Sequence, residues 1–262
     1  MLDRLWFISD VHSPAHDKKA WRLVLDALAD FKPDVFVSLG DFMDLSSVSH
    51  WSKDPNTALD LAAERTVAET MLAEIETRTE GARRIYVAGN HEDRLKRFLQ
   101  DKAPQFFNVL DIPKLLRLEE RGWEYVPYKQ SVKVGKLHIT HDVGSAGRYN
   151  VYKALDTFQS PVVTGHTHRL GYVVEGDATG DSQVSAQFGW LGDVEQVDYM
   201  HRVKARRDWT LGFGYGYVNP KSGYAYLVPV PIIGYTAVVE GRLYQAASKM
   251  SSRKTTRSSR TV

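Results

Sequence analysis

The N-terminal part of the chain alternates short apolar runs with amphipathic helical stretches, and this alternation constrains the fold more than any other feature. The strand-like runs cover residues 5–8, 34–39 and 84–88. The helical patterns cover residues 17–31, 57–79 and 92–100, the first opened by Asp17 as a helix cap. This β-α-β-α-β order predicts an α/β sheet with largely parallel strands. Because the runs are continuously apolar, we expect both faces of the sheet to be covered.

The pattern changes after Gly122. Short β-branched segments separated by glycine or turn residues cover residues 131–134, 136–141, 161–164, 169–174 and 182–188. They predict a second, more antiparallel sheet, with one helix near residues 148–158. Residues 199–236 are rich in Tyr, Trp and Gly, which is compatible with irregular hairpins of undefined register.

Composition is that of a soluble globular protein, with 43% hydrophobic and 25% charged residues. One domain is expected over residues 1–245, followed by a basic, Ser/Thr-rich tail over 246–262 that has little to bury and is expected to be disordered. No apolar run approaches the roughly 20 residues needed to cross a bilayer, and no signal peptide is visible. The absence of cysteine excludes disulfides and thiolate metal ligands. We therefore expect a cytoplasmic protein without membrane contact.

The formal net charge of +2 conceals an asymmetry. Six basic residues and no acidic residue follow Gly241, so residues 1–240 hold 28 basic against 32 acidic side chains. The basic character therefore belongs to the C-terminal segment, and the body of the chain is slightly acidic.

Five of the strand-like runs end in polar groups that can bind metal ions. The groups are Asp10-Val11-His12, Gly40-Asp41, Gly89-Asn90-His91, His141 and Gly165-His166-Thr167-His168. Ligand sites in open α/β sheets lie at the C-terminal ends of strands, so these groups could converge. Each motif alone is more typical of an ordinary loop or turn, but their occurrence together, each at a strand end, favours a metal site.

The candidate ligands supply oxygen and imidazole nitrogen but no sulfur. They are Asp10, His12, Asp41, Asn90, His141, His166 and His168. Such a set suits Mn, Fe, Zn or Co. Seven groups are too many for one ion with an open position, whereas two ions that share a carboxylate would use them all. In phosphoryl-transfer enzymes, the two metal ions of such a site lie roughly 3.5–4 Å apart.

These motifs resemble the calcineurin-like metallophosphoesterases over about residues 5–170. The family pattern is Asp-x-His, Gly-Asp-x-x-Asp, Gly-Asn-His-(Asp/Glu), a lone His and Gly-His-x-His. The resemblance implies an α/β fold, an αββα sandwich of two mixed β-sheets flanked by helices. It also implies hydrolysis of phosphate esters with two divalent metal ions, for which we expect Mn²⁺, with Fe, Zn or Co as alternatives.

The resemblance also implies a role for each ligand. Asp10, His12 and His168 would bind the first metal ion. Asn90, His141 and His166 would bind the second, and Asp41 would bridge the two ions. His138 is the other candidate for the lone histidine, but His141 ends its run and is preferred.

Three neighbouring residues complete the implied site. His91 corresponds to the histidine of the family that binds phosphate and protonates the leaving group. Asp44 and Glu92 would orient histidines by hydrogen bonds, although solvated loop acids are an equally good interpretation of both. The sequence departs from the pattern in two places. Asp142 follows His141 where glycine is usual. Leu45 stands where the protein Ser/Thr phosphatases of the superfamily carry arginine, a function that Arg94 could partly replace.

The substrate is less well defined by the sequence. The basic tail and the Arg/Lys-rich stretch 202–207, which leads into Trp209 and further aromatic residues, favour DNA or RNA slightly. His50 follows the second motif and could line the cleft. A nuclease or phosphodiesterase is therefore the first hypothesis. The alternatives are a phosphatase or phosphodiesterase on nucleotides, small phosphoesters or phosphoproteins, and a non-catalytic metal-binding scaffold.

Overall fold

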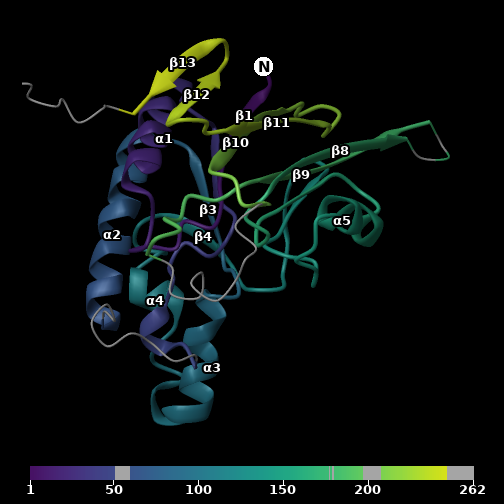
Figure 1. The fold of residues 1–262 in the computed structure, drawn as a ribbon. Coiled ribbons are helices and arrows are strands. Elements are labelled where there is room, and N and C mark those ends of the chain that lie inside the picture. The colour runs from purple at the N-terminus through teal and green to yellow at the C-terminus, as the bar shows by residue number, and fades with distance from the viewer. Residues whose placement is uncertain (51–59, 177, 179, 197–207, 247–262) are drawn as a thin grey trace, which may run out of the picture.

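The computed structural model describes residues 1–50, 60–176, 178, 180–196 and 208–246. Two β-sheets pack face to face, and the helices cover their outer faces (Figure 1). The larger sheet has the strand order β11-β10-β1-β2-β3-β4, and the smaller has the order β5-β6-β7-β9-β8. The predicted αββα sandwich is confirmed.

The larger sheet is built from the alternating N-terminal elements. Strands β1 (Asp3–Ile8), β2 (Val35–Ser38), β3 (Arg83–Val87) and β4 (Trp123–Val126) run parallel. Helices α1 (Lys18–Phe31), α2 (Leu61–Arg78) and α4 (Ile112–Leu116) lie along its outer face. As predicted, the Asp17 side chain caps α1 by accepting hydrogen bonds from the amides of Lys19 and Ala20. The predicted start of α2 at 57–59 lies outside the described residues.

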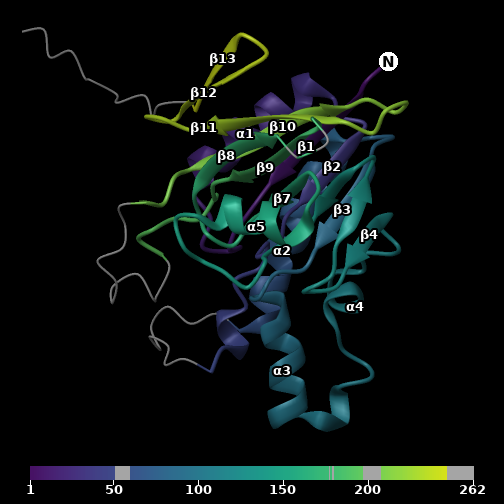
Figure 2. The same ribbon diagram turned by 90° about the vertical axis from the view of Figure 1, so that its right-hand side faces the viewer.

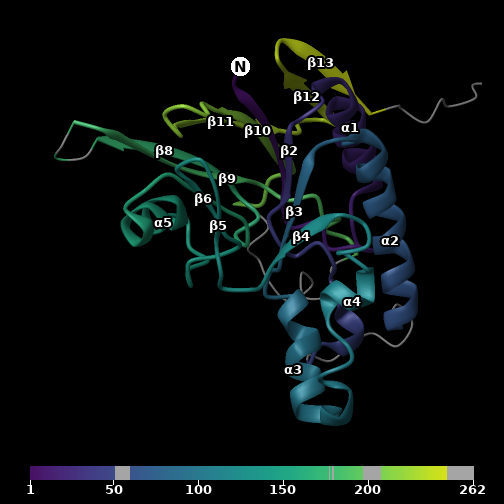
Figure 3. The same ribbon diagram turned by 180° about the vertical axis from the view of Figure 1, so that it is seen from behind.

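The smaller sheet is mixed and not predominantly antiparallel. It contains β5 (Val132–Val134), β6 (Leu137–Ile139), β7 (Val162–Thr164), β8 (Leu170–Gly176) and β9 (Ser182–Phe188). The pairs β5–β6 and β8–β9 are antiparallel, whereas β6–β7 and β7–β9 are parallel. Helix α5 (Asn150–Phe158) connects β6 to β7 and covers the outer face of this sheet (Figure 3).

The residues at 212–231 form regular strands, where the sequence indicated irregular hairpins. Strand β10 (Gly212–Val218) pairs antiparallel with β1, and β11 (Ala225–Pro231) pairs with β10. Glycines alternate with aromatic residues along β10 because the glycine side faces the smaller sheet closely. A Cβ atom on Gly214 would overlap the ring of Phe188, which itself stacks on Phe7 at 4.9 Å between ring centroids.

The remaining elements extend the sandwich at its two ends. Helix α3 (Glu92–Lys102) projects from the C-terminal end of β3, together with the short 3₁₀ helices η1 (Ser46–Val48) and η2 (Pro104–Phe106) (Figure 2). At the other end, the hairpin of β12 (Thr236–Val239) and β13 (Arg242–Gln245) packs on α1, where Tyr244 donates a hydrogen bond to Asp30 (3.0 Å). Within the described residues, no helix is long and apolar enough to span a membrane. Residues 247–262, where a disordered tail is expected, lie outside the described part.

Two apolar cores hold these layers together. One lies between the two sheets and includes Phe7, Val37 and Phe188; the other lies between the larger sheet and its helices and includes Trp6 and Phe36. The β1, β2 and β3 side chains alternate between these cores, which explains their continuously apolar sequences. The C-terminal ends of these strands lie at one edge of the sandwich, beside the end of β7.

Candidate metal centre

The structure brings the seven candidate ligands together at one edge of the sandwich, between the two sheets. Each lies in a loop that follows a strand: β1, β2, β3, β6 or β7. The residues are Asp10, His12, Asp41, Asn90, His141, His166 and His168. Asp10, His12 and His141 are fully buried, so the sandwich shields these ligands from solvent.

The first group contains Asp10, His12 and His168. The Nε2 atoms of His12 and His168 lie 3.1 Å apart, and Nε2 of His168 lies 3.2 Å from Oδ1 of Asp10. The two Nε2 atoms are so close that they can hold at most one proton between them, so at least one of them presents a lone pair. This lone pair and the Asp10 carboxylate oxygen point to the same place, as the ligands of a cation do.

The second group contains Asp41, Asn90, His141 and His166. Nε2 of His141 lies 3.3 Å from Oδ2 of Asp41 and 3.1 Å from Oδ1 of Asn90. The same Asn90 oxygen lies 2.7 Å from Nδ1 of His166. The other ring nitrogen of His141, Nδ1, donates to the carbonyl oxygen of Leu39 at 2.7 Å. This bond fixes the tautomer in which Nε2 presents its lone pair to a metal ion.

The electrostatics of the metal-free site are strongly perturbed. Burial raises the pKa of Asp41, but the charge of His141 and its hydrogen bond outweigh burial, so the pKa is well below the ordinary value. Asp10 shows a lowered pKa in the same way, through His168. Burial alone would lower the pKa of His141, but Asp41 raises it to about 10. In the metal-free site, protonated histidines therefore neutralise the charge of the carboxylates, as bound metal ions would.

The backbone is strained at the ligands. Five of them are non-glycine residues with left-handed φ values: Asp10 (50°), His12 (53°), Asp41 (49°), His166 (70°) and His168 (58°). This conformation is uncommon for residues with a side chain, and its concentration here is typical of functional sites. Close packing explains the glycine before Asn90, because a Cβ atom on Gly89 would overlap the Asp41 carboxylate.

His91 lies beside the two groups and is linked to Asp44 and Arg94. Its Nδ1 is 2.9 Å from the carbonyl oxygen and 3.1 Å from Oδ1 of Asp44. Its Nε2 is 3.8 Å from Oδ2 of Asp41 and 2.8 Å from Nη2 of Arg94. Asp44 also lies 3.1 Å from Nδ1 of His12 and so contacts both a candidate ligand and His91, as a histidine-orienting residue would.

Glu92 is buried and bonds mainly to the backbone. Its carboxylate accepts hydrogen bonds from the amides of Asp41 (3.0 Å), Met43 (3.0 Å) and Gly89 (2.8 Å), and from the hydroxyl of Tyr86 (2.9 Å). Glu92 therefore ties the loop after β2 to the loop after β3. It is no solvated loop acid, and these bonds position the loop that carries Asp41.

The other predicted residues take varied positions. His138 packs its ring on Phe158 at 4.8 Å between centroids, on the α5 side of the sheet. Leu45 is fully buried in the core, whereas Arg94 donates to the Asp44 carbonyl oxygen at 2.7 Å from the neighbouring helix. His50 is exposed just after η1.

Two tryptophans lie beside His168. The sequence did not single out Trp190, and it indicated Trp209 only as an aromatic residue that could contact nucleic acid. The His168 ring stacks on Trp190 (4.9 Å between centroids, 11° between planes) and meets Trp209 edge-on at 4.1 Å. Within the described part of the chain, Nδ1 of His168 is buried without a hydrogen-bond partner, so aromatic packing orients this ring. Trp190 follows Gly189 at the end of a strand, just as several candidate ligands follow a glycine at the end of a strand. This position in the sequence is the feature that could have identified Trp190 as a site residue.

Comparison with known proteins identifies the family. The sequence model of the calcineurin-like phosphoesterases matches residues 3–170. The chain belongs to this family. Proteins that resemble it over nearly the full length include the Gene 54 proteins of two Mycobacterium phages. The protein of phage D29 is 29% identical over 94% of this chain and 100% of its own length, and that of phage L5 is 27% identical over the same shares.

Similar solved structures are more distant. Vps29 from Entamoeba histolytica is 10% identical, with a TM-score of 0.44 over 92% of this chain and 95% of that chain. YfcE, a phosphoesterase from E. coli, is 15% identical, with a TM-score of 0.37 over 86% and 98%. The nuclease MPE from Pseudomonas putida is 15% identical, with a TM-score of 0.38 over 86% and 87%. Family membership and the clustered ligands make the protein a metal-dependent phosphoester hydrolase.

Proposed function

We propose that this enzyme is a phosphodiesterase that uses two divalent metal ions and acts on nucleic acid. The observation that carries the proposal is the division of the ligands into two groups, one around His12 and His168 and one around His141 and Asn90. Each group supplies three or more oxygen and nitrogen atoms that already point toward one another.

The residues present suit such ions. Asp10, His12 and His168 would hold one ion, Asn90, His141 and His166 the other, and Asp41 would be shared. The ions would supply Lewis acidity, which activates water and neutralises the charge that develops on phosphate. The oxygen and imidazole donors favour Mn²⁺, and they also suit Fe, Zn and Co.

His91 is the side chain placed to move a proton during turnover. A guanidinium can only donate, so the contact with Arg94 makes Nε2 of His91 an acceptor and leaves its proton on Nδ1, toward Asp44. Burial alone would lower the pKa of His91, but the charge of Asp41 and the bond to Asp44 raise it above the ordinary value. His91 can therefore take up a proton at Nε2 and donate it to a leaving oxygen, while Arg94 binds a phosphate oxygen.

Two features support a nucleic acid substrate. Trp209 is partly exposed next to His168, where its ring could stack on a base beside the scissile phosphate. In the sequence, only Asp208 separates Trp209 from the Arg/Lys-rich stretch 202–207, and the C-terminal tail adds further positive charge that could neutralise phosphates.

The slightly acidic body of the chain favours a second candidate, hydrolysis of nucleotides or other small phosphoesters. The two can be separated by one panel of substrates at fixed Mn²⁺. The panel contains 4-nitrophenyl phosphate, bis(4-nitrophenyl) phosphate, cyclic nucleotides, and single- and double-stranded DNA. We expect hydrolysis of the diesters and of DNA, loss of activity in EDTA, and little turnover by Asp41→Asn. Activity confined to monoesters would contradict the proposal, and unchanged activity in EDTA would contradict the metal requirement.

A further inference from the structure

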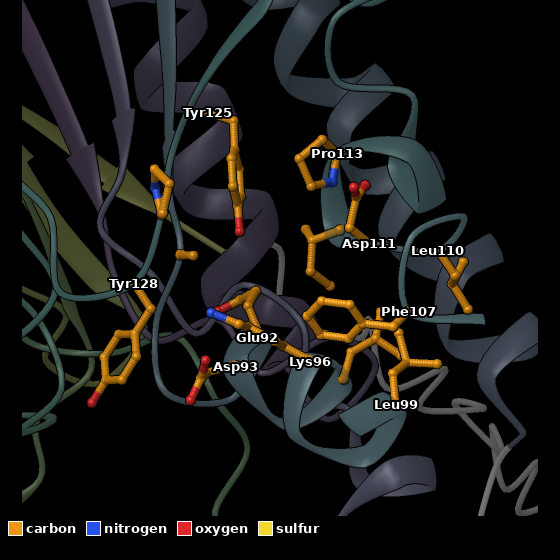
Figure 4. Close-up of a pocket in the computed structure, with 14 residues that line it drawn as sticks. Glu92, Asp93, Lys96, Leu99, Phe107, Leu110, Asp111, Pro113, Tyr125 and Tyr128 are labelled. Carbon is orange, nitrogen blue, oxygen red and sulfur yellow. The ribbon is translucent and has the colours of Figure 1, made fainter. Parts of the chain in front are cut away.

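A cavity of about 290 Å³ is lined by helix α3 and by the loop after β3 (Figure 4), and it lies next to the candidate metal centre. The two sites share this loop: Asn90 belongs to the ligand cluster, whereas Ala88, Glu92 and Asp93 line the cavity. Tyr128 lines it as well, and its ring lies 6.3 Å from the ring of His141. A molecule in this cavity would therefore lie beside the edge of the sandwich that carries the candidate metal ligands.

The size and lining of the cavity define what it can hold. Its volume is at the lower end of the roughly 300–1,000 Å³ of small-molecule pockets, which suits one ring system. Most of the wall is apolar and comes from α3, the segment after it, and α4. The residues are Leu95, Leu99, Phe107, Leu110, Ile112 and Pro113.

A few polar groups interrupt this apolar wall. The hydroxyl of Tyr125 points into the cavity and forms no hydrogen bond with any described residue (Figure 4). Burial raises the pKa of Tyr125, so the hydroxyl stays protonated and can donate as well as accept. Asp111 and Lys96 add an acceptor and a donor at the wall.

The charges argue against an anion in the cavity itself. Three acidic residues, Glu92, Asp93 and Asp111, line the cavity against one basic residue, Lys96, and Asp93 and Asp111 form ion pairs with Arg97 (2.9 Å) and Lys114 (3.4 Å). The cavity therefore has no excess of positive charge that would bind a phosphate. A neutral, flat group with apolar faces and a polar edge would match both the wall and its donors and acceptors.

We infer that this cavity is a subsite for one nucleobase of the substrate, next to the scissile phosphate. The inference rests on the proposed action on nucleic acid and specifies it further. The base would contact the apolar wall with its faces and the Tyr125 hydroxyl with its edge.

The test compares two diesters that differ only in the nucleoside. These are thymidine 5′-(4-nitrophenyl phosphate) and methyl 4-nitrophenyl phosphate, which release the same phenolate. Leu110→Trp narrows the cavity from its partly exposed rim. Val109→Trp is the matched control, because Val109 is 63% exposed and does not line the cavity. Tyr125→Phe removes only the hydroxyl and preserves the shape of the ring.

We expect Leu110→Trp to lower the ratio of kcat/KM for the thymidine diester to that for the methyl diester about fivefold or more, the lower end of what one stacked base contributes. Tyr125→Phe should lower the ratio about two- to fivefold, as expected for one hydrogen bond. Val109→Trp should preserve it. Equal ratios in Leu110→Trp, Val109→Trp and the wild type would overturn the inference.

Binding of thymidine itself separates failure of this inference from failure of the proposed function. Saturation-transfer NMR of the full chain with Zn²⁺ should show thymidine bound to the wild type and to Val109→Trp, but weakened in Leu110→Trp. If the wild type hydrolyses neither diester, the proposed function fails, but thymidine binding still tests the cavity. Thymidine that binds Leu110→Trp as well as the wild type would show that the base lies elsewhere.

Discussion

His91 differs from the neighbouring histidines in what its ring nitrogens contact. Its Nδ1 faces Asp44 and its Nε2 faces Arg94 at 2.8 Å. Nε2 of His91 lies 3.8 Å from the Asp41 carboxylate, farther than the 3.3 Å between Nε2 of His141 and the same carboxylate, although His91 also clusters with His12 and Asp44. We therefore expect His91→Gln to retain the metal content of the wild type but to slow turnover. For a diester with an alkoxide leaving group, the loss should be about 10²–10⁴-fold, the usual contribution of general acid catalysis. With 4-nitrophenolate, which leaves without a proton, the loss should be much smaller.

His166→Gln is the matched comparison for His91→Gln. Nδ1 of His166 lies 2.7 Å from Asn90, in the second ligand group, so its loss should reduce metal content and affect both leaving groups alike. Metal analysis of both variants accompanies the kinetics. Loss of metal from His91→Gln would refute its role as an acid, as would an equal rate loss for both leaving groups when chemistry limits the rate.

The pair of His141 and Asp41 predicts the pH dependence of metal binding. Burial would lower the pKa of His141, but Asp41 raises it to about 10 from 6.5. In the metal-free protein, the stabilisation from the protonated imidazole is therefore complete below pH 6.5 and is lost as the pH rises through 10. Because a metal ion requires the neutral imidazole, the ion must displace this proton.

Metal affinity should accordingly rise between pH 6.5 and 8.5, by up to about tenfold per pH unit for one displaced proton. Titration calorimetry with Zn²⁺ in buffers of different ionisation enthalpy measures both the affinity and the number of protons released. A constant affinity without proton release would show that His141 is neutral before the metal binds.

At this scale, the sequence predicts which polar side chains lie together at the site, because each one closely follows a buried run. The contacts of His168 with Trp190 and Trp209 were not predictable in the same way. They depend on β9 lying directly beside β7, and this strand order is set by packing between distant segments.

The elements that hold the site are joined through Glu92 at the start of α3. One oxygen of its carboxylate accepts from the amides of Asp41 and Gly89, and the other accepts from the amide of Met43 and the Tyr86 hydroxyl. In Glu92→Gln, one of these pairs of donors would face an NH₂ group. We expect the free energy of unfolding to fall by about 1–3 kcal/mol, as when buried donors lose an acceptor.

Urea denaturation of the metal-free protein measures this change, and metal content should fall with it because the loop of Asp41 loosens. The control is Glu119→Gln, which changes the same charge at an exposed position. If Glu92→Gln and Glu119→Gln unfold at the same urea concentration and bind the same amount of metal, Glu92 does not hold the two loops together.

Helices and strands whose apolar residues recur at a regular spacing were predicted from the sequence. Elements that depend on contacts with segments far away in the sequence were not. The strands and helices between Leu5 and Phe188 follow their apolar patterns closely, apart from the short β4 and α4. Strand β10 lacks an apolar alternation because glycines fill one of its faces. The approach of the Phe188 ring from the other sheet explains Gly214, and close contact with Tyr226 and Leu227 of β11 explains Gly216. The sequence does not reveal these approaches.

On the scale of the whole molecule, the sandwich ends with a hairpin, and the basic tail follows it. Strand β13 ends at Gln245, and the amide of Ala246 still donates to the Tyr235 carbonyl oxygen at 3.0 Å. A truncation that preserves the fold should therefore remove residues 247–262. This segment carries Lys249, Arg253, Lys254, Arg257 and Arg260 and no acidic residue, whereas residues 1–240 are slightly acidic.

We expect the truncated protein to retain its melting temperature and its hydrolysis of bis(4-nitrophenyl) phosphate, because Ser, Thr, Lys and Arg dominate the removed segment and leave it little apolar surface to bury. If the tail binds nucleic acid, affinity for DNA should fall, and the slope of log K against log salt should become shallower by about 0.7–0.9 for each phosphate that the tail no longer neutralises. A full-length variant with all five cations changed to Gln should behave like the truncation, which separates charge from chain length. An unchanged salt slope in both variants would show that the tail does not bind phosphates, and a large drop in melting temperature would show that it belongs to the folded domain.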